Sequence, residues 1–143
     1  LCEELGIGFI AYGPLGKGFL TGTVSASAHF AEGDSRAILP RFSEENRRAN
    51  QGLVDAIAHM AADHGATSGQ IALAWLMARS PAVIPIPGTT KLHRLEENVA
   101  AAALSLSRSD LAGLDAALAQ VEIHGARLAP RWAQSEAGSV ETT

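Results

Sequence analysis

Two short apolar segments, each ended by a glycine turn, place the tightest constraint on the fold of this 143-residue chain. They occupy residues 8–13 (GFIAYG) and 83–87 (VIPIP), and helix-forming sequence separates them. Apolar runs of this length between turn signals are typical of buried strands. Strands joined through helices usually lie parallel with a right-handed crossover, and a parallel sheet needs both faces covered. The sequence therefore predicts an α/β fold in which the two parallel strands cannot stand alone.

Helix signals lie between and after these strands. Ser43 can cap a helix that begins with two glutamates, and the segments TSGQ (67–70) and SRSD (107–110) are capping boxes. The helix after the first box is apolar on most sides, so it is expected to be buried, with Trp75 in the core. The expected helices cover residues 43–65, 71–77, 91–103 and 107–121.

Composition excludes several classes of protein. Hydrophobic residues make up 47% of the chain, enough for one modest core, and the net charge of −4 does not favour a nucleic-acid surface. The adjacent residues Arg47 and Arg48 are expected on a solvated helix face. The single cysteine, Cys2, rules out an intramolecular disulfide and a cysteine zinc cluster.

The sequence also lacks clear signals for metal binding, membrane insertion and export. His59 and His64 are five residues apart instead of the four that place two ligands on one helix face, so surface positions are expected. No apolar run approaches the roughly 18–20 residues of a membrane span. The chain opens with acidic residues where a signal peptide would be basic. These features predict a cytoplasmic protein that binds neither metal, membrane nor nucleic acid.

The segment after the second strand has the character of an anion site. A glycine turn, Pro87-Gly88, leads into two threonines and then into a helix that begins near Lys91 and Arg94. The first N–H groups of a helix lack intrahelical partners and favour anions. Lys91 and Arg94, three residues apart, could both contact one phosphate. The same residues also suit an ordinary solvated connection, so spacing alone leaves both interpretations open.

Residues 86–99 (IPGTTKLHRLEENV) resemble the coenzyme-binding signature of the aldo-keto reductases, in the form written by a bacterial branch of that family. The resemblance implies a (β/α)8 TIM barrel that binds NADP(H) without a Rossmann fold. It places this segment at the end of the eighth strand and the start of the eighth helix.

The resemblance also implies roles for individual residues of this segment. The positions that match the binding of the 2′-phosphate of the adenosine ribose are Thr89, Lys91 and Arg94. Those that match adenine contacts are Glu97 and Asn98. Many relatives place a lysine at the position of Gly88, so the grip on the phosphate is expected to depend on the two remaining cations.

A second block, residues 11–16 (AYGPLG), resembles the exit of the seventh strand in the same family. The resemblance implies that Tyr12 stacks on the nicotinamide ring and that Gly13, Leu15 and Lys17 lie along the diphosphate. Gly13 replaces the usual serine, which removes one hydroxyl. From its position alone, Tyr12 reads instead as a buried strand aromatic. The glycine spacing matches neither the G-x-G-x-x-G fingerprint nor a Walker loop.

Together with the helix segment IALAWL, these blocks cover nearly the whole chain, which is predicted to be one partial domain over residues 1–143. A complete barrel needs about 200 residues or more. The chain opens in what reads as the last turn of a helix stopped by Gly6. It is therefore expected to be the C-terminal part of a longer barrel, with about its last two strands and their helices.

Two irregular segments complete the chain. The resemblance implies that the loop over residues 20–42 folds over the coenzyme and helps to line the substrate pocket. Phe30, Arg41 and Phe42 are candidate wall residues there, although an aromatic residue in a loop more often anchors it. The C-terminal tail, residues 125–143 with Trp132, is expected to reach the substrate mouth.

The resemblance implies that the parent protein reduces small aldehydes or ketones with NADPH. In this family the proton donor is a tyrosine assisted by Asp, Lys and His, all carried by the first four strands, so this chain is expected to hold no catalytic residue. One alternative is a non-enzymatic NADP(H)-binding regulatory subunit similar to potassium-channel β subunits. Another is a remnant without a stable fold. Substrate identity and oligomeric state stay undefined.

Overall fold

The computed structural model describes residues 1–129, which divide into two compact units. The first unit comprises Leu1–Val24 and Gly52–Val121, and the second comprises Ser25–Gln51 and the chain from Glu122 onward. Most of the predicted tail, including Trp132, falls outside the described residues.

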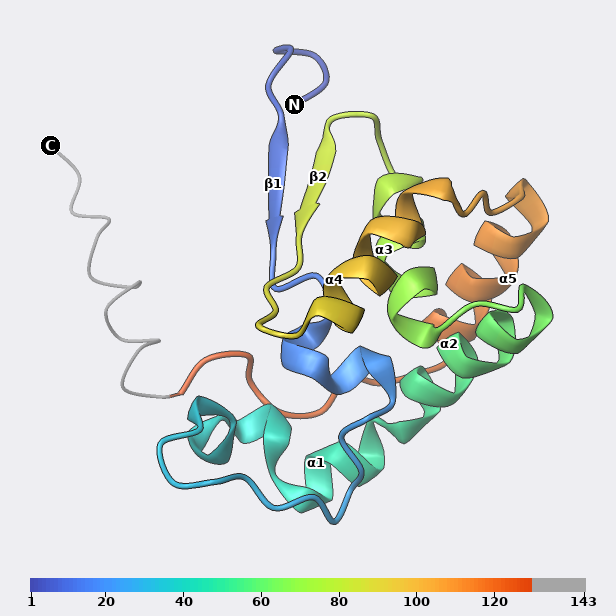
Figure 1. Cartoon of the computed structure of the whole chain (residues 1–143). Helices are drawn as coiled ribbons and strands as arrows, with labels where there is room; N and C mark the ends of the chain where they lie inside the picture. The colour runs from blue at the N-terminus through green and yellow to red at the C-terminus, as the bar shows by residue number, and fades with distance from the viewer. Residues whose placement is uncertain (130–143) are drawn as a thin grey trace, which may run out of the picture. The chain divides into compact units, whose positions relative to one another are not determined.

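The first unit contains the predicted pair of parallel strands, β1 (Phe9–Tyr12) and β2 (Val83–Ile86). Their register aligns Phe9 with Val83 and Tyr12 with Ile86. Figure 1 shows both strands running in the same direction, with the two following loops leaving from the same end. The predicted parallel pairing is confirmed.

The expectation that these strands are buried is wrong for the chain as described. Only Ala11 is buried in the two strands, whereas Phe9 and Ile10 are 52% and 54% exposed. In β2, Ile84 and Ile86 are also exposed. The physical reason is that few elements of the described chain pack on the faces of these strands. A strand is buried only where other elements pack on both faces, and the helix that packs against β2 here is α3 (Ser68–Met77).

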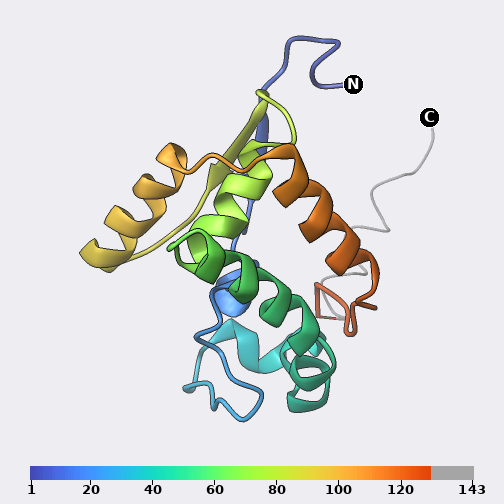
Figure 2. The same ribbon diagram turned by 90° about the vertical axis from the view of Figure 1, so that its right-hand side faces the viewer.

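The helices of the first unit enclose a small core. Ile71 of α3 is fully buried, and Ile57, Ala61 and Leu114 pack in the same cluster. Both predicted capping boxes are present. In Figure 2, α3 lies between α4 and α5. The remaining elements of this unit are the 3-10 turns Gly16–Thr21 and Ala101–Ala103, and the helices α2 (Gln51–Asp63), α4 (Leu92–Ala100) and α5 (Arg108–Ala119).

The first residues form the helix end that the sequence predicts. The N–H of Gly6 donates to the carbonyl of Glu3, and the N–H of Ile7 donates to the carbonyl of Cys2. Gly6 is left-handed, with φ of 63°. This paired 5→2 and 6→1 pattern is the Schellman motif that closes helices.

Trp75 is only half-buried instead of lying fully in the core, because its indole takes part in a polar contact between α3 and α5. Its Nε1–H donates to Asp115 Oδ1 at 2.9 Å. The guanidinium of Arg79 donates to both oxygens of Asp115, at 2.6 and 2.9 Å, and lies 4.0 Å from the centre of the Trp75 ring. These two donors, Arg79 first and Trp75 second, lower the pKa of the Asp115 carboxyl.

The substitution Asp115→Asn should make the stability of the first unit less sensitive to acid. A carboxyl whose pKa is lowered on folding stabilises the fold fully above its usual value of 3.8, and this stabilisation is lost as the pH falls through the lower folded value. In a background with Trp132 replaced by Phe, urea unfolding followed by Trp75 fluorescence should show Asp115→Asn to be less stable than the unchanged residue at neutral pH. The difference should shrink below pH 3.8. Asp63→Asn, at an exposed position of α2, is the control, and an equal response from it would contradict the assignment.

The predicted surface positions of the two histidines hold only for His59, which is exposed. His64 is half-buried, and its Nε2 lies 3.3 Å from Asp110 Oδ2. Asp110 is the acidic member of the second capping box, so the α5 N-terminus brings a carboxylate to the end of α2. Sequence spacing around the histidines carries no signal for this contact.

The helix predicted over residues 43–65 is interrupted at Asn50. Ser43 caps α1 (Glu44–Ala49) as predicted, and α2 begins at Gln51, so Asn50 is the single residue between the two helices. Asn50 is 1% exposed, and its side chain makes two hydrogen bonds to the backbone of His124: Nδ2 donates to the carbonyl, and Oδ1 accepts from the N–H. The backbone of Asn50, with φ of −85° and ψ of 2°, leaves helical geometry.

In the second unit, α1 follows two short 3-10 turns, Ser35–Ile38 and Pro40–Phe42. Phe42 is buried and meets Phe30 edge to face, with ring centres 5.7 Å apart. This packing is what an aromatic anchor of the loop would show. Arg41 makes two hydrogen bonds to residues 125–126 of the same unit. Its Nε donates to the carbonyl of Gly125, and its backbone N–H donates to the carbonyl of Ala126.

The prediction that Arg47 and Arg48 share a solvated face is wrong for Arg47. Arg48 is exposed and pairs with Glu44 at 2.8 Å, as expected. Arg47 is only 4% exposed, because its side of α1 faces Phe30 and the backbone at Ala26. Neighbouring residues of a helix point about 100° apart, so one arginine can be solvated while the next is enclosed.

Candidate functional site

The candidate site of the first unit lies where β1 and β2 both end. Because Tyr12 and Ile86 are aligned, the loops that follow them leave from the same edge of the sheet (Figure 1). Ligands of α/β proteins bind in the crevice outside the carboxyl ends of parallel strands. The structure therefore brings both sequence-predicted blocks to one edge. Tyr12 is 67% exposed there, so the alternative of a buried strand aromatic does not hold in the described residues.

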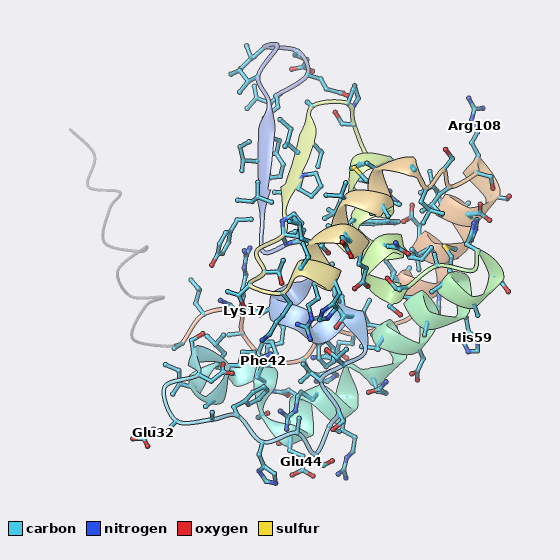
Figure 3. The ribbon with its side chains drawn as sticks, in the orientation of Figure 1. Lys17, Glu32, Phe42, Glu44, His59 and Arg108 are labelled. Carbon is cyan, nitrogen blue, oxygen red and sulfur yellow. The ribbon has the colours of Figure 1, made fainter. Side chains whose placement is uncertain are left out.

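The loop after β1 is tightly wound. Gly13 has φ of 66°, a left-handed conformation that a serine would adopt only with strain, and its carbonyl accepts from the N–H of Gly16 at 3.0 Å. The carbonyl of Leu15 accepts from the N–H of Gly18. Figure 3 shows Lys17 beside the lower end of β1. This loop contains Gly13, Leu15 and Lys17, the three residues that the resemblance places along the diphosphate.

Lys17 has an unusual backbone. Its φ of 55° makes it the one residue other than glycine with positive φ among residues 1–129. A left-handed conformation costs a non-glycine residue about 1–2 kcal/mol. Such strain persists only where surrounding structure enforces it, and it is concentrated at ligand-binding sites. This feature was not visible in the sequence, where the Gly-Lys-Gly segment indicated only a loop.

The loop after β2 leads to an open helix N-terminus. Lys91 is the N-cap of α4 and makes no side-chain capping bond, and the first turn of α4 carries no acidic residue. Thr89 Oγ1 accepts from the N–H of Lys91 at 3.1 Å, which folds the threonine toward the helix start. Lys91 and Arg94 are exposed, and neither forms an ion pair within the part of the chain that the structure describes.

Gly88 is exposed at the beginning of this second loop. A Cβ added there would meet no atom within 4 Å, so a side chain would fit without any rearrangement. Its φ is not positive either, since it is absent from the left-handed glycines of the described chain. The backbone therefore does not require glycine at this position.

Glu97 and Asn98 lie farther along α4, on the same side as Arg94, because residues three and four apart share a helix face. Glu97 is already engaged: Thr67 Oγ1 donates to its carboxylate, and Gln70 Nε2 donates to its backbone carbonyl at 3.2 Å. The capping box of α3 is thus shared with α4. Sequence analysis missed this link, since its partners are 30 residues apart and each box residue already had a local role.

The chemistry offered by this edge suits a phosphate ester. It combines two exposed cations, an uncapped helix N-terminus and a glycine-rich loop, all of which favour anions. Residues 1–129 contain no group of three or more His, Cys, Asp or Glu that could hold a metal ion. Within the same residues, none of the helices has the length and apolar character needed to span a bilayer.

Comparisons with known proteins agree with the resemblance. The model of the aldo/keto reductase family matches residues 1–119. The chain is 40% identical over 129 residues to aldo-keto reductase yakc of Schizosaccharomyces pombe, whose name specifies NADP(+), covering 90% of this chain and 38% of that protein. It is 40% identical over 125 residues to aldo-keto reductase str7 of Strobilurus tenacellus, covering 87% of this chain and 37% of the relative.

A plant relative gives the same result: the chain is 39% identical over 127 residues to probable aldo-keto reductase 1 of Glycine max, covering 89% of this chain. The chain thus spans 36–38% of the length of these relatives. The family implies a (β/α)8 barrel, and the parallel β1–β2 pair with its helices is consistent with part of one. Its sequence match over residues 1–119 shows that the chain belongs to the aldo/keto reductase family.

Proposed function

We propose that this chain is the NADP(H)-binding portion of an oxidoreductase that reduces small aldehydes or ketones by hydride transfer, and that β1 and β2 are the last two strands of its barrel. The observation that carries the proposal is the common edge from which both the Tyr12 loop and the segment leading to the uncapped α4 N-terminus leave the sheet. Membership of the aldo/keto reductase family and the NADP(+) in the name of one relative support it.

The residues of this edge would divide the coenzyme between them. The exposed ring of Tyr12 offers a face for the nicotinamide, and Lys17 of the wound loop after it would lie along the diphosphate. The 2′-phosphate would lie at the start of α4, whose first turns carry Lys91 and Arg94 and whose N-terminus favours anions. The residues assigned to the coenzyme are Tyr12, Gly13, Leu15, Lys17, Gly88, Thr89, Lys91, Arg94, Glu97 and Asn98.

The chain would bind and orient the coenzyme without completing the reaction. When bound, NADPH supplies the hydride. Tyr12, the only tyrosine of the chain, is committed to the nicotinamide in this proposal, so no tyrosine is left to donate a proton. The proton donor and its Asp, Lys and His partners would come from other strands of the parent protein.

The test is a binding and turnover experiment on the 143-residue chain and on its full-length parent. Isothermal titration should show that NADPH binds to the parent about tenfold or more tightly than NADH, because only NADPH carries the 2′-phosphate. The parent should reduce aldehydes or ketones, and the 143-residue chain alone should not. Equal affinity for both coenzymes in the parent would contradict the phosphate site. Carbonyl reduction by the purified chain would contradict the placement of the catalytic groups.

A further inference from the structure

Thr67 holds the carboxylate of Glu97 while it also caps α3. As the N-cap residue, its Oγ1 accepts from the N–H of Gln70 at 3.2 Å. The same Oγ1 donates its proton to Glu97 Oε1 on α4. A hydroxyl group donates and accepts at once, so one side chain can fill both roles. The start of α3 therefore fixes a carboxylate that belongs to the neighbouring helix.

Two further features of α3 fit this carboxylate. The first turn of α3 carries no acidic residue, so Glu97 supplies the negative charge that a helix N-terminus favours. Gly69 is buried in the same turn, and a Cβ added to it would lie 3.3 Å from Glu97 Oε1. Glycine weakens a helix relative to alanine. Here its lack of a side chain leaves room for the carboxylate.

The backbone of Glu97 is held by the same capping box. Gln70 Oε1 accepts from the N–H of Thr67 at 3.0 Å, and Gln70 Nε2 donates to the carbonyl of Glu97 at 3.2 Å. The box therefore binds the side chain and the main chain of one residue of α4. Because α4 has no buried apolar side chain of its own, these two hydrogen bonds help to orient it on α3.

The second oxygen of Glu97 keeps its capacity to accept. Oε2 accepts no hydrogen bond from residues 1–129, and the carboxylate forms no ion pair with them. An ionised carboxylate only accepts hydrogen bonds. The 6-amino group of adenine donates, whereas the 6-oxo group of hypoxanthine accepts. A carboxylate held in one orientation therefore favours adenine over hypoxanthine.

We propose that Thr67 is a positioning residue of the coenzyme site, which orients Glu97 so that its second oxygen accepts from the 6-amino group of adenine. The inference rests on the proposed function, in which Glu97 contacts the adenine. Thr67 would act only through Glu97, without touching the coenzyme. Its contribution is selectivity for the base at the far end of the dinucleotide from the reacting ring.

The experiment measures the dissociation constants of NADPH and of its hypoxanthine analogue on the full-length parent by titration calorimetry. The unchanged parent should bind NADPH about tenfold or more tightly, because the analogue loses a hydrogen bond to a charged acceptor. Thr67→Ala should lower this ratio by about threefold or more, since the carboxylate of Glu97 is then free to turn. Thr67→Ser keeps a hydroxyl that donates and accepts, so it should preserve the ratio.

The second capping box provides the matched control. Ser107→Ala removes the cap of α5 in the same unit, and the hydrogen bonds of Ser107 stay within its own turn. Its ratio should equal that of the unchanged parent. Should Thr67→Ala fail to fold, Thr67→Asp provides the second variant. Its carboxylate caps a helix well but cannot donate to Glu97, so the ratio should fall in the same way.

Failure of the positioning role is distinguishable from failure of the proposed function. A parent that prefers NADPH to NADH, but has the same adenine selectivity with and without the Thr67 hydroxyl, would overturn the positioning role alone. So would a parent that does not distinguish adenine from hypoxanthine. An equal loss of selectivity in Ser107→Ala would also overturn it, because the loss of any helix cap would then suffice. A parent that binds NADPH no more tightly than NADH would overturn the phosphate site and this inference together.

Discussion

Replacing Lys91 and Arg94 together by alanine should weaken the binding of NADPH to the full-length parent by about 100-fold or more. Each would lose a charge-assisted hydrogen bond of about 1.5–3 kcal/mol to the 2′-phosphate, and about 1.4 kcal/mol corresponds to a factor of ten. Both side chains are exposed at an uncapped helix N-terminus that carries no acidic residue, so no carboxylate of that turn competes with the phosphate for them. NADH lacks the 2′-phosphate, so its dissociation constant should be almost unchanged.

The test compares the dissociation constants of NADPH and NADH, both measured by titration calorimetry on the double variant and the unchanged parent. Arg108→Ala is the control, since Arg108 is an exposed arginine at the start of another helix and extends outward in Figure 3. It should leave both affinities unchanged. An equal loss for NADPH and NADH in the double variant would mean that the helix had moved or unfolded, and the phosphate role would be rejected.

Gly125→Ala should destabilise the second unit by about 2–5 kcal/mol, from about 1–2 kcal/mol for the left-handed backbone and about 1–3 kcal/mol for overlap. Gly125 has φ of 83°. A Cβ there would lie 2.7 Å from Arg41 Cα and from Asn46 Nδ2, and Arg41 Cα belongs to backbone that cannot swing away. Hydrogen exchange of the His124 N–H, which donates to buried Asn50 Oδ1 within this unit, should accelerate by about 30-fold or more.

Gly33→Ala separates the two contributions. Gly33 has the same φ of 83° in the same unit, but a Cβ there would meet no atom within 4 Å. It should therefore show only the smaller backbone cost. If Gly125→Ala accelerated exchange no more than Gly33→Ala did, close packing of the 124–126 segment against Arg41 would not be what holds this unit together.

Features with short-range causes could be predicted from the sequence. The capping boxes that begin at Thr67 and Ser107 form because the partners are three residues apart and the geometry of a helix start fixes them. The parallel pairing of β1 and β2 followed from the helical sequence between them. The two loops of the candidate site could be located because strand ends, glycine turns and helix starts all carry local signals.

Features that depend on contacts between residues far apart in the chain could not be predicted from the sequence. Asn50 interrupts a helix because it binds the backbone of His124, 74 residues away, and nothing near Asn50 indicates that partner. Arg47 carries a charge that predicts solvation, but tertiary packing on Phe30 buries it. The strands were expected to be buried from their composition, yet burial depends on what covers them. Each of these outcomes is decided by a contact that short-range patterns do not encode.

The attachment of α4 has a consequence for how the phosphate site would respond to a ligand. α4 contains no buried residue, and its carboxylate at Glu97 ties it to the start of α3. A helix mounted in this way can shift as a rigid rod without opening the apolar cluster around Ile71. If the proposed phosphate binds there, a small displacement of α4 would move Lys91 and Arg94 together without exposing that apolar cluster.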